Sequence, residues 1–233
     1  IAHGIFDKND FYTNRPFLHE KFIYINVVKP SYEFGVGFVH EAMWGGSTVL
    51  LGDQPQTIKD FFKVFISADG PFFEGQSHAN ALGNHLGIWD FYYKRVISDK
   101  ELKLYYQHFF EDTSGLRFDN KSDGLWGIEL SNFLKNTNIL FEYLNTTNQD
   151  IDPPYVNENY YNHYEYQEGW SYKGYSIGNP FINYLDNNPS KVSAPGQYKL
   201  HYSPGIPIRL NVKKIKTNEA YLLIKKNKET KSN

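Results

Sequence analysis

Hydrophobic and polar residues alternate with a period of two along much of the chain, which predicts β-strands. In residues 32–43 the apolar residues Phe34, Val36 and Phe38 alternate with small or charged residues, so one face of this strand is apolar. Similar patterns predict strands at 21–28, 85–97, 102–110, 125–132, 138–145, 198–212 and 220–224. We therefore expect an all-β protein with about eight antiparallel strands, a number typical of sheets and small barrels.

The connections between these strands are of two kinds. Short turns are expected at 29–31, 98–100, 134–136 and near 217, and long loops at 44–83, 111–123 and 146–195. Short turns on one side and long loops on the other are typical of an outer-membrane β-barrel. A soluble antiparallel β-sandwich with uneven loops remains the alternative. Within the first long loop, residues 57–65 predict a short helix capped by Thr57.

The chain is interpreted as a single β-barrel domain, 1–233. Residues 1–19 lead into the barrel strands of 20–145, and the long aromatic loop 146–195 precedes the final strands of 196–224 and a frayed basic tail, 225–233. The chain begins at Ile1, without an initiator methionine or signal peptide, so we expect a mature or truncated piece of a partial barrel.

Charged residues inside the predicted strands change this picture further. Glu33, Glu41, Asp90, Lys94, Lys103, Glu129 and Glu142 all fall within strands. In a barrel they would face a polar lumen, and in a sandwich they would form the wet face. The barrel interpretation directs the opposite, apolar faces toward lipid; these carry Phe34, Val36, Phe38, Leu102, Leu104, Tyr106, Trp126, Ile128 and Leu130.

Composition excludes several classes of protein. The formal net charge of −2 gives no long-range attraction for nucleic acid, so no nucleic-acid partner is expected. The absence of cysteine excludes disulfides, zinc–thiolate sites, iron–sulfur clusters and thiol nucleophiles. No apolar run reaches the roughly 18–20 residues of a membrane-spanning helix.

Catalytic and metal-binding patterns are weak. The eight histidines are scattered and show no His-x₃-His spacing, so we expect no metal site and no cofactor. A serine hydrolase is not indicated, because no Gly-x-Ser-x-Gly elbow is present. Carboxylates for glycoside hydrolysis exist, but the sequence places no two of them at catalytic separation. We expect no catalytic residue, and an envelope carbohydrate-active enzyme remains a minor alternative.

Aromatic residues supply the more informative chemistry, since they make up 18% of the chain. Residues 157–173 combine tyrosines and Trp170 with amides and carboxylates. Aromatic rings can stack on sugar rings while amides and carboxylates bind hydroxyls, which favours a carbohydrate ligand. The same residues could instead form the aromatic girdle of a barrel or a compact lid.

Several segments together resemble the Wzi-type capsule assembly proteins, in the version seen in Bacteroidetes. These segments cover roughly residues 12–184: Tyr32–Ser47, Asn80–Asp90, Tyr105–Gly115, Asp123–Leu130, Ile139–Asn145 and Gly169–Pro180. The barrel of that family is longer than this chain, residues 191–233 do not follow its pattern, and the chain does not end in the aromatic residue typical of outer-membrane barrels.

The resemblance implies a lectin-like, non-catalytic protein of the cell outer membrane that binds capsular polysaccharide and contacts outer-membrane lipid. The matching positions with sugar-binding chemistry are Trp44, Asn80, Asn84, His85, Trp89, Asp90, His108, Glu111, Asp112, Trp170, Tyr172, Lys173 and Asn179. A porin-like or structural barrel without a specific ligand is the alternative function.

Overall fold

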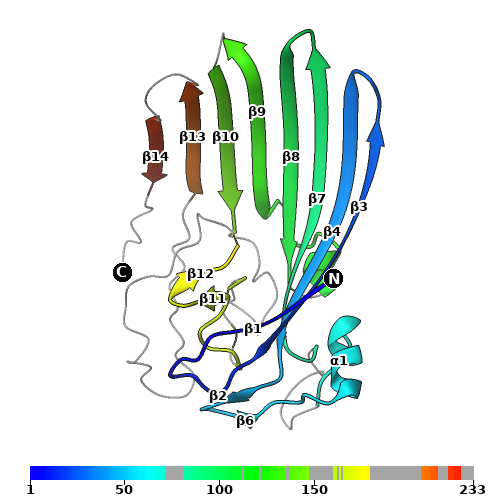
Figure 1. Ribbon diagram of the computed structural model, residues 1–233, viewed down its shortest axis with the longest axis vertical. Coiled ribbons are helices and arrows are strands. Elements are labelled where there is room, and N and C mark those ends of the chain that lie inside the picture. The colour runs from blue at the N-terminus through cyan, green and yellow to red at the C-terminus, as the bar shows by residue number, and fades with distance from the viewer. Residues whose placement is uncertain are drawn as a thin grey trace.

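A long antiparallel sheet forms most of the protein in the computed structural model (Figure 1). The structure describes residues 1–71, 81–111, 113–120, 122–134, 137–146, 160–161, 163 and 165–178, and the backbone of 206–214 and 220–226. Nine strands lie in the order β1-β3-β4-β7-β8-β9-β10-β13-β14. Their bounds are β1 Ala2–Ile5, β3 Phe17–Val28, β4 Tyr32–Trp44, β7 Asn84–Ile97, β8 Lys100–Phe110, β9 Gly124–Leu134, β10 Thr137–Asn145, β13 Ile206–Lys214 and β14 Ala220–Lys226.

Shorter elements gather at one end of this sheet. They are β2 Tyr12–Asn14, β5 Ser47–Thr48, β6 Gly52–Asp53, α1 Ile58–Phe65, α2 Thr113–Leu116, β11 Ser171–Tyr172 and β12 Tyr175–Ser176. The strands β2, β5 and β6 form one small sheet, and β11 pairs with β12 in a hairpin. We call this end the loop end, because the long connections of the sheet lie there, and the opposite end the turn end (Figure 1).

The expected all-β, antiparallel fold is confirmed, and closure of the sheet into a barrel stays a prediction. Strand bounds mostly agree to within two residues, but β3 begins at Phe17, earlier than expected, and β14 continues to Lys226, into the segment expected to be a frayed tail. The strand expected at 198–212 is described from Ile206 as β13, and its expected start at 198–205 lies outside the described residues. The predicted helix is also confirmed. Thr57 caps α1 through a capping box, since its side chain accepts from the Asp60 backbone and Asp60 accepts from the Thr57 backbone.

One face of the sheet is apolar from strand to strand, and we call it the outer face. A row of cross-strand partners runs through Val27, Phe34, Tyr93, Leu104, Ile128 and Phe141, from β3 to β10. The register continues this row to Leu210 of β13 and Leu222 of β14. Large side chains on this face stay exposed, among them Ile23, Ile25, Phe34, Leu104, Trp126 and Ile128. The residues expected to share an apolar face therefore do so.

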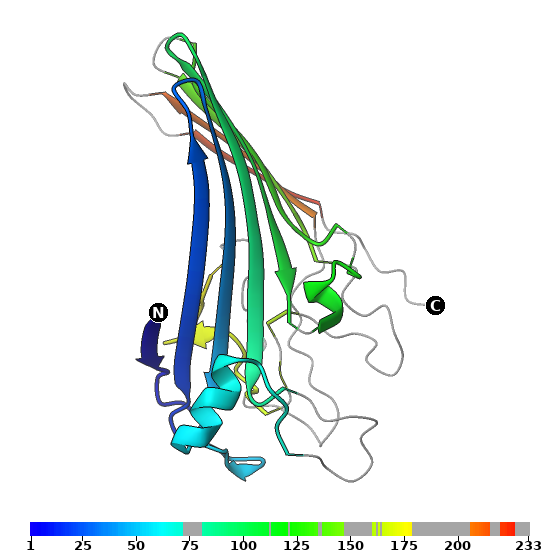
Figure 2. The same cartoon turned by 90° about the vertical axis from the view of Figure 1, so that its right-hand side faces the viewer.

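Helix α1 covers the loop end of the outer face. Its Val64 is fully buried against Ala42, Trp44 and Leu82, with Phe61 packed beside them. The Phe61 ring lies 5.5 Å from the His19 ring and 5.7 Å from the Trp44 ring. Figure 2 shows α1 lying along the sheet at this end. Apolar packing, rather than helix propensity, thus holds this eight-residue helix in place.

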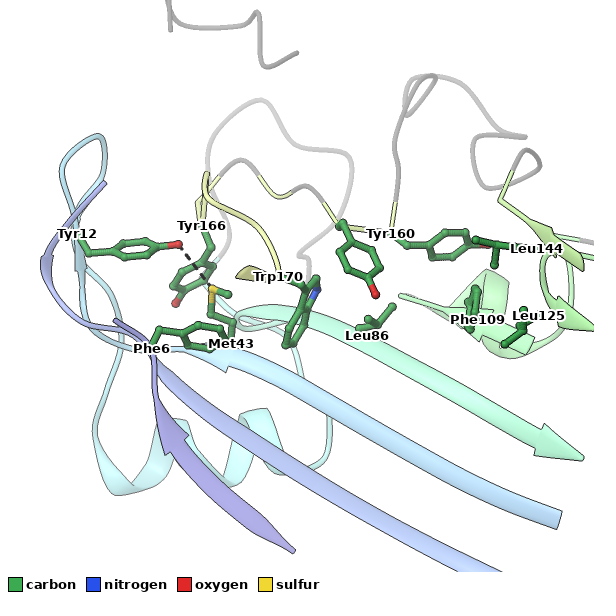
Figure 3. Packing of buried hydrophobic residues seen from close by; sticks show 11 residues of the cluster. Phe6, Tyr12, Met43, Leu86, Phe109, Leu125, Leu144, Tyr160, Tyr166 and Trp170 are labelled. Atoms are coloured by element: carbon green, nitrogen blue, oxygen red, sulfur yellow. Dashed lines mark hydrogen bonds between the residues drawn. The ribbon is translucent and has the colours of Figure 1, made fainter. Parts of the chain in front are cut away.

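The opposite face, which we call the inner face, is covered at the same end by an aromatic core (Figure 3). Residues from the lead-in segment, the strands and the 160–170 segment pack together there. They are Phe6, Tyr12, Met43, Leu86, Phe109, Leu125, Leu144, Tyr160, Tyr161, Tyr166 and Trp170. We call this cluster the aromatic cap. It holds Tyr160, Tyr161, Tyr166 and Trp170 against the sheet, although they are far from the strands β4 and β7 in sequence.

Candidate functional site

A tyrosine lies across three neighbouring strands on the inner face, beyond the aromatic cap. Tyr24 of β3 and Asp90 of β7 are both cross-strand partners of Gly37 on the strand between them. The Tyr24 ring passes over Gly37, and its hydroxyl donates to Asp90 Oδ2 over 3.2 Å. A Cβ atom on Gly37 would lie 2.3 Å from Tyr24 Cε1, so the crossing requires glycine.

The same arrangement recurs three strands further along the sheet. Tyr105 of β8 passes over Gly127 of β9, and its hydroxyl donates to Glu142 of β10. A Cβ on Gly127 would lie 1.9 Å from Tyr105 Cζ. Because glycine again stands under the ring, both crossings place a phenol flat on the backbone with a carboxylate at its hydroxyl.

A third tyrosine, on β7, and a lysine, on β8, connect these two crossings. Tyr92 covers Gly35, its cross-strand partner, and its hydroxyl donates to Glu33. Lys103 Nζ lies 5.5 Å from the centre of the Tyr92 ring and 5.4 Å from that of Tyr105, within range of cation–π attraction to both. We call the whole set the tyrosine wall: Tyr24, Tyr92, Tyr105, Glu33, Asp90, Glu142 and Lys103.

The tyrosine wall has the chemistry of a surface for sugars. Its rings offer flat apolar area at low conformational cost, because a phenol has few rotatable bonds and each ring rests on backbone. Carboxylate oxygens are the acceptors that hydroxyl groups of sugars donate to. The Lys103 ammonium supplies a donor with three N–H groups at the centre of the wall.

Four of the predicted site residues lie on the outer face instead. Trp44 packs under α1, and Trp89 contacts Phe38 with ring centres 4.8 Å apart. His85 Nδ1 lies 2.9 Å from His40 Nε2. His108 is fully buried, and both of its ring nitrogens lie near backbone carbonyl oxygens, of Asp123 and Gly115. All four therefore stand on the face opposite the tyrosine wall.

The other predicted residues do not form one cluster. Asp90 belongs to the tyrosine wall, Asn84 is buried at the start of β7, and Glu111 is half-buried after β8. Tyr172 and Lys173 are exposed on the β11–β12 hairpin, with Lys173 Nζ 5.3 Å from the centre of the Tyr172 ring. Asn80, Asp112 and Asn179 lie outside the described residues.

Trp170 has a structural position in the aromatic cap. Only 1% of its surface is exposed, and its ring meets Phe6 edge-on with centres 6.3 Å apart. Ile177 donates a backbone hydrogen bond to the Trp170 carbonyl, which closes the segment around it. Contact between this indole and a sugar would therefore require the loop to move.

A buried polar network joins the cap to the 111–123 segment. The Tyr160 hydroxyl donates to Asp123 Oδ2 over 2.9 Å, and Asn120 Nδ2 lies 2.5 Å from the same hydroxyl. Burial raises the pKa of Tyr160, and the charge of Asp123 adds to this effect. The phenol consequently keeps its proton and the network stays intact, so it anchors Tyr160 to Asn120 and Asp123.

Most of the tyrosine wall was missed by residue-type reasoning. The sequence does carry one signal: Glu33, Lys103 and Glu142 are charges within strands, on the polar side of the alternation. The tyrosines become visible as partners only with the register, which sets each ring over its glycine. Within the described residues, no cluster of three or more His, Cys, Asp or Glu side chains is placed to hold a metal ion.

Comparison with known proteins identifies the family. A family model described as capsule assembly protein Wzi matches residues 1–185. The chain belongs to the Wzi family. This is a family of non-catalytic, outer-membrane capsule assembly proteins. No curated protein and no solved structure matches the chain. None of the helices in the described ranges is long and apolar enough to span a membrane.

Proposed function

We propose that this Wzi-family protein binds capsular polysaccharide in a lectin-like, non-covalent way, on the tyrosine wall and the exposed Tyr172–Lys173 hairpin tip. The observation that carries the proposal is the repeated crossing, in which a phenol lies over glycine and meets a carboxylate. Repeated surfaces of this kind suit a repeating polymer, because several weak contacts add through multivalency.

In this proposal the strands span the outer membrane and close into a barrel. The outer face then contacts lipid, since its large apolar side chains are exposed from β3 to β10, while the inner face lines a polar interior. Asp90, Tyr172 and Lys173 are the predicted site residues that we retain as polysaccharide contacts. The buried Trp170 and the outer-face residues act through packing.

The test is binding of capsular polysaccharide, purified from the host strain, to the full-length protein in detergent. Tyr24→Leu removes a wall ring, and Tyr172→Ala removes the ring at the hairpin tip. The matched control is Tyr32→Leu, because Tyr32 is also an exposed tyrosine but lies at the turn end, where it stacks on Tyr93. Loss of an aromatic contact should weaken binding by about tenfold or more.

Each outcome of this experiment has a distinct meaning. Weaker binding by Tyr24→Leu, with Tyr32→Leu unchanged, supports the tyrosine wall. An effect of Tyr172→Ala alone moves the binding surface to the hairpin. If the wild-type protein binds no polysaccharide, the lectin-like function is overturned, and conductance in planar bilayers then tests a porin-like barrel.

A further inference from the structure

Helix α1 has an apolar side that the sheet does not use. Phe61, Val64 and Phe65 face the sheet, where they meet Trp44 and His19. The stripe of Ile58, Phe62 and Ile66, spaced four residues apart and therefore on one side of the helix, is exposed by 75%, 62% and 70%. Most short surface helices turn a polar side outward, so this exposed stripe requires a partner.

The position of α1 along the sheet indicates which partner this is. The Lys21 ammonium donates to the Phe65 carbonyl and lies 4.5 Å from the centre of the Phe65 ring, which joins the end of α1 to β3. The exposed apolar residues of the outer face begin two residues further on, at Ile23, and continue to Val27. The strand rises about 20 Å over the six residues that follow Lys21, up to Val27.

The apolar band of outer-membrane proteins is about 25 Å tall. A band that begins at the turn end near Val27 therefore ends close to α1. The helix lies on the same face as the band and continues it, so it stands at the depth where acyl chains meet head groups. A helix whose exposed side is apolar is stable at this boundary, whereas water would leave its apolar side without a favourable contact.

Charges on α1 fit the same boundary. Lys59 is exposed next to the stripe, and Lys63 follows one turn later, where its ammonium donates to the Asp69 carbonyl over 3.1 Å. The acidic residue of the helix, Asp60, is turned toward its own N-terminus, where it accepts from Thr57. The border of the stripe is thus cationic, which complements the anionic head groups of membrane lipids.

We propose that α1 is a lipid-docking helix. Its stripe of Ile58, Phe62 and Ile66 enters the acyl layer of the leaflet at the loop end, and Lys59 and Lys63 contact anionic head groups. The helix thereby fixes the depth of the protein in the membrane. This inference rests on the outer-membrane location of the family and is independent of polysaccharide binding.

The experiment uses single cysteines, because the chain has none of its own. Phe62→Cys reports on the stripe, Ile25→Cys on the apolar band and Tyr175→Cys on a surface in water; Ile25 is 67% and Tyr175 78% exposed. Each variant of the full-length protein is nitroxide-labelled and reconstituted into vesicles. The accessibility of the label to oxygen is then compared with its accessibility to a water-soluble nickel complex.

We expect the Phe62→Cys label to behave like the Ile25→Cys label, with high oxygen and low nickel accessibility. Nickel accessibility equal to that of Tyr175→Cys would overturn the proposal, as it would place the stripe in water. Shielding from both reagents would overturn it too, because it would indicate contact with a protein or a second copy of the chain.

The head-group contact has its own test. Vesicles of phosphatidylethanolamine are compared with vesicles that also contain an anionic lipid. The Phe62→Cys label should move deeper when the anionic lipid is present, and should lose this response when Lys59→Gln and Lys63→Gln are added. The same movement without the two lysines would overturn their assigned contact with head groups.

Discussion

Tyrosines of the aromatic cap and of the tyrosine wall occupy the same face of one sheet but differ in what surrounds them. Tyr160 and Tyr166 are almost fully buried, and their hydroxyls bond to groups inside the protein, Asp123 and the Gly45 carbonyl. Tyr24 instead lies on glycine with much of its ring exposed. Both regions use tyrosine, and the packing around each ring decides whether it is buried in the core or exposed on the sheet.

This difference teaches that aromatic content alone does not locate a binding surface. In the cap, rings contact other rings and aliphatic side chains, as the 5.9 Å separation of the Phe109 and Tyr160 rings illustrates. In the wall, one face of each ring rests on the backbone and the other faces away from the sheet. Mutations should therefore separate stability, which depends on the cap, from binding, which we propose for the wall.

The largest effect is expected from Trp170→Ala in the cap. Truncating a fully buried aromatic side chain leaves a cavity and should lower the free energy of unfolding by about 3–5 kcal/mol. Chemical denaturation of the protein in detergent measures this change. Tyr172→Ala, at an exposed position two residues later, is the control and should stay within about 0.5 kcal/mol. Equal losses for both variants would contradict the distinction between the buried cap and the exposed hairpin.

A smaller effect is expected from the titration of Glu168, a buried residue two positions before Trp170 of the cap. Burial raises its pKa from 4.5 to about 7; a hydrogen bond with Ser171 opposes this shift, and the charge of Asp7 adds to it. Because the pKa is higher in the folded than in the unfolded state, this contribution to stability is complete below about pH 4.5. It is lost as the pH rises through 7, by about 2 kcal/mol.

Hydrogen exchange of the backbone amides of residues 165–178 between pH 5 and pH 8, corrected for the intrinsic exchange rate, measures this loss of stability. Glu168→Gln should remove the dependence, since the amide does not ionise and can still accept from Asn9, which donates to Glu168. A pH dependence of equal size in this variant would assign the effect to another group.

The smallest effect is expected from Gly127→Ala in the wall. The new methyl group would overlap the Tyr105 ring, so the ring must swing away from Glu142, at a cost of about 1–2 kcal/mol. Gly4→Ala is a matched control on β1, because a Cβ there meets Leu18 at an ordinary 3.6 Å. The cost of Gly127→Ala should be smaller in a protein that already carries Tyr105→Ala, because the overlapping ring is then absent. An equal cost in both proteins would show that the two residues are not coupled as the crossing requires.

Much of the fold could be predicted because strand alternation is a local signal. Phe34, Val36 and Phe38 were placed on one face from their spacing, and Thr57 was identified as a helix cap from its residue type. The loop that carries Trp170 has no such period, so nothing in its sequence distinguished a buried indole from an exposed one. Burial there depends on Phe6, which lies far away in the chain.

The candidate site was less predictable for a related reason. Trp89 and Asp90 are adjacent in sequence, so on a strand they point to opposite faces, and only Asp90 reaches the tyrosine wall. A selection by chemical type alone therefore placed residues of the outer and the inner face in one candidate site. The hydrogen bond from Tyr24 across Gly37 to Asp90 requires the register of three strands, which is a property of the sheet and not of any segment.

The crossings also have a mechanical consequence. The β3–β4 and β7–β8 ladders run lengthwise between the loop end and the turn end (Figure 1). A polymer held at the loop end and dragged by flow would pull along the strands, so the hydrogen bonds of a ladder would share the load in shear. The side chains of Tyr24 and Tyr105 each cross three strands at right angles to that pull and bond to a carboxylate on the third. They would therefore resist sliding of neighbouring strands past one another.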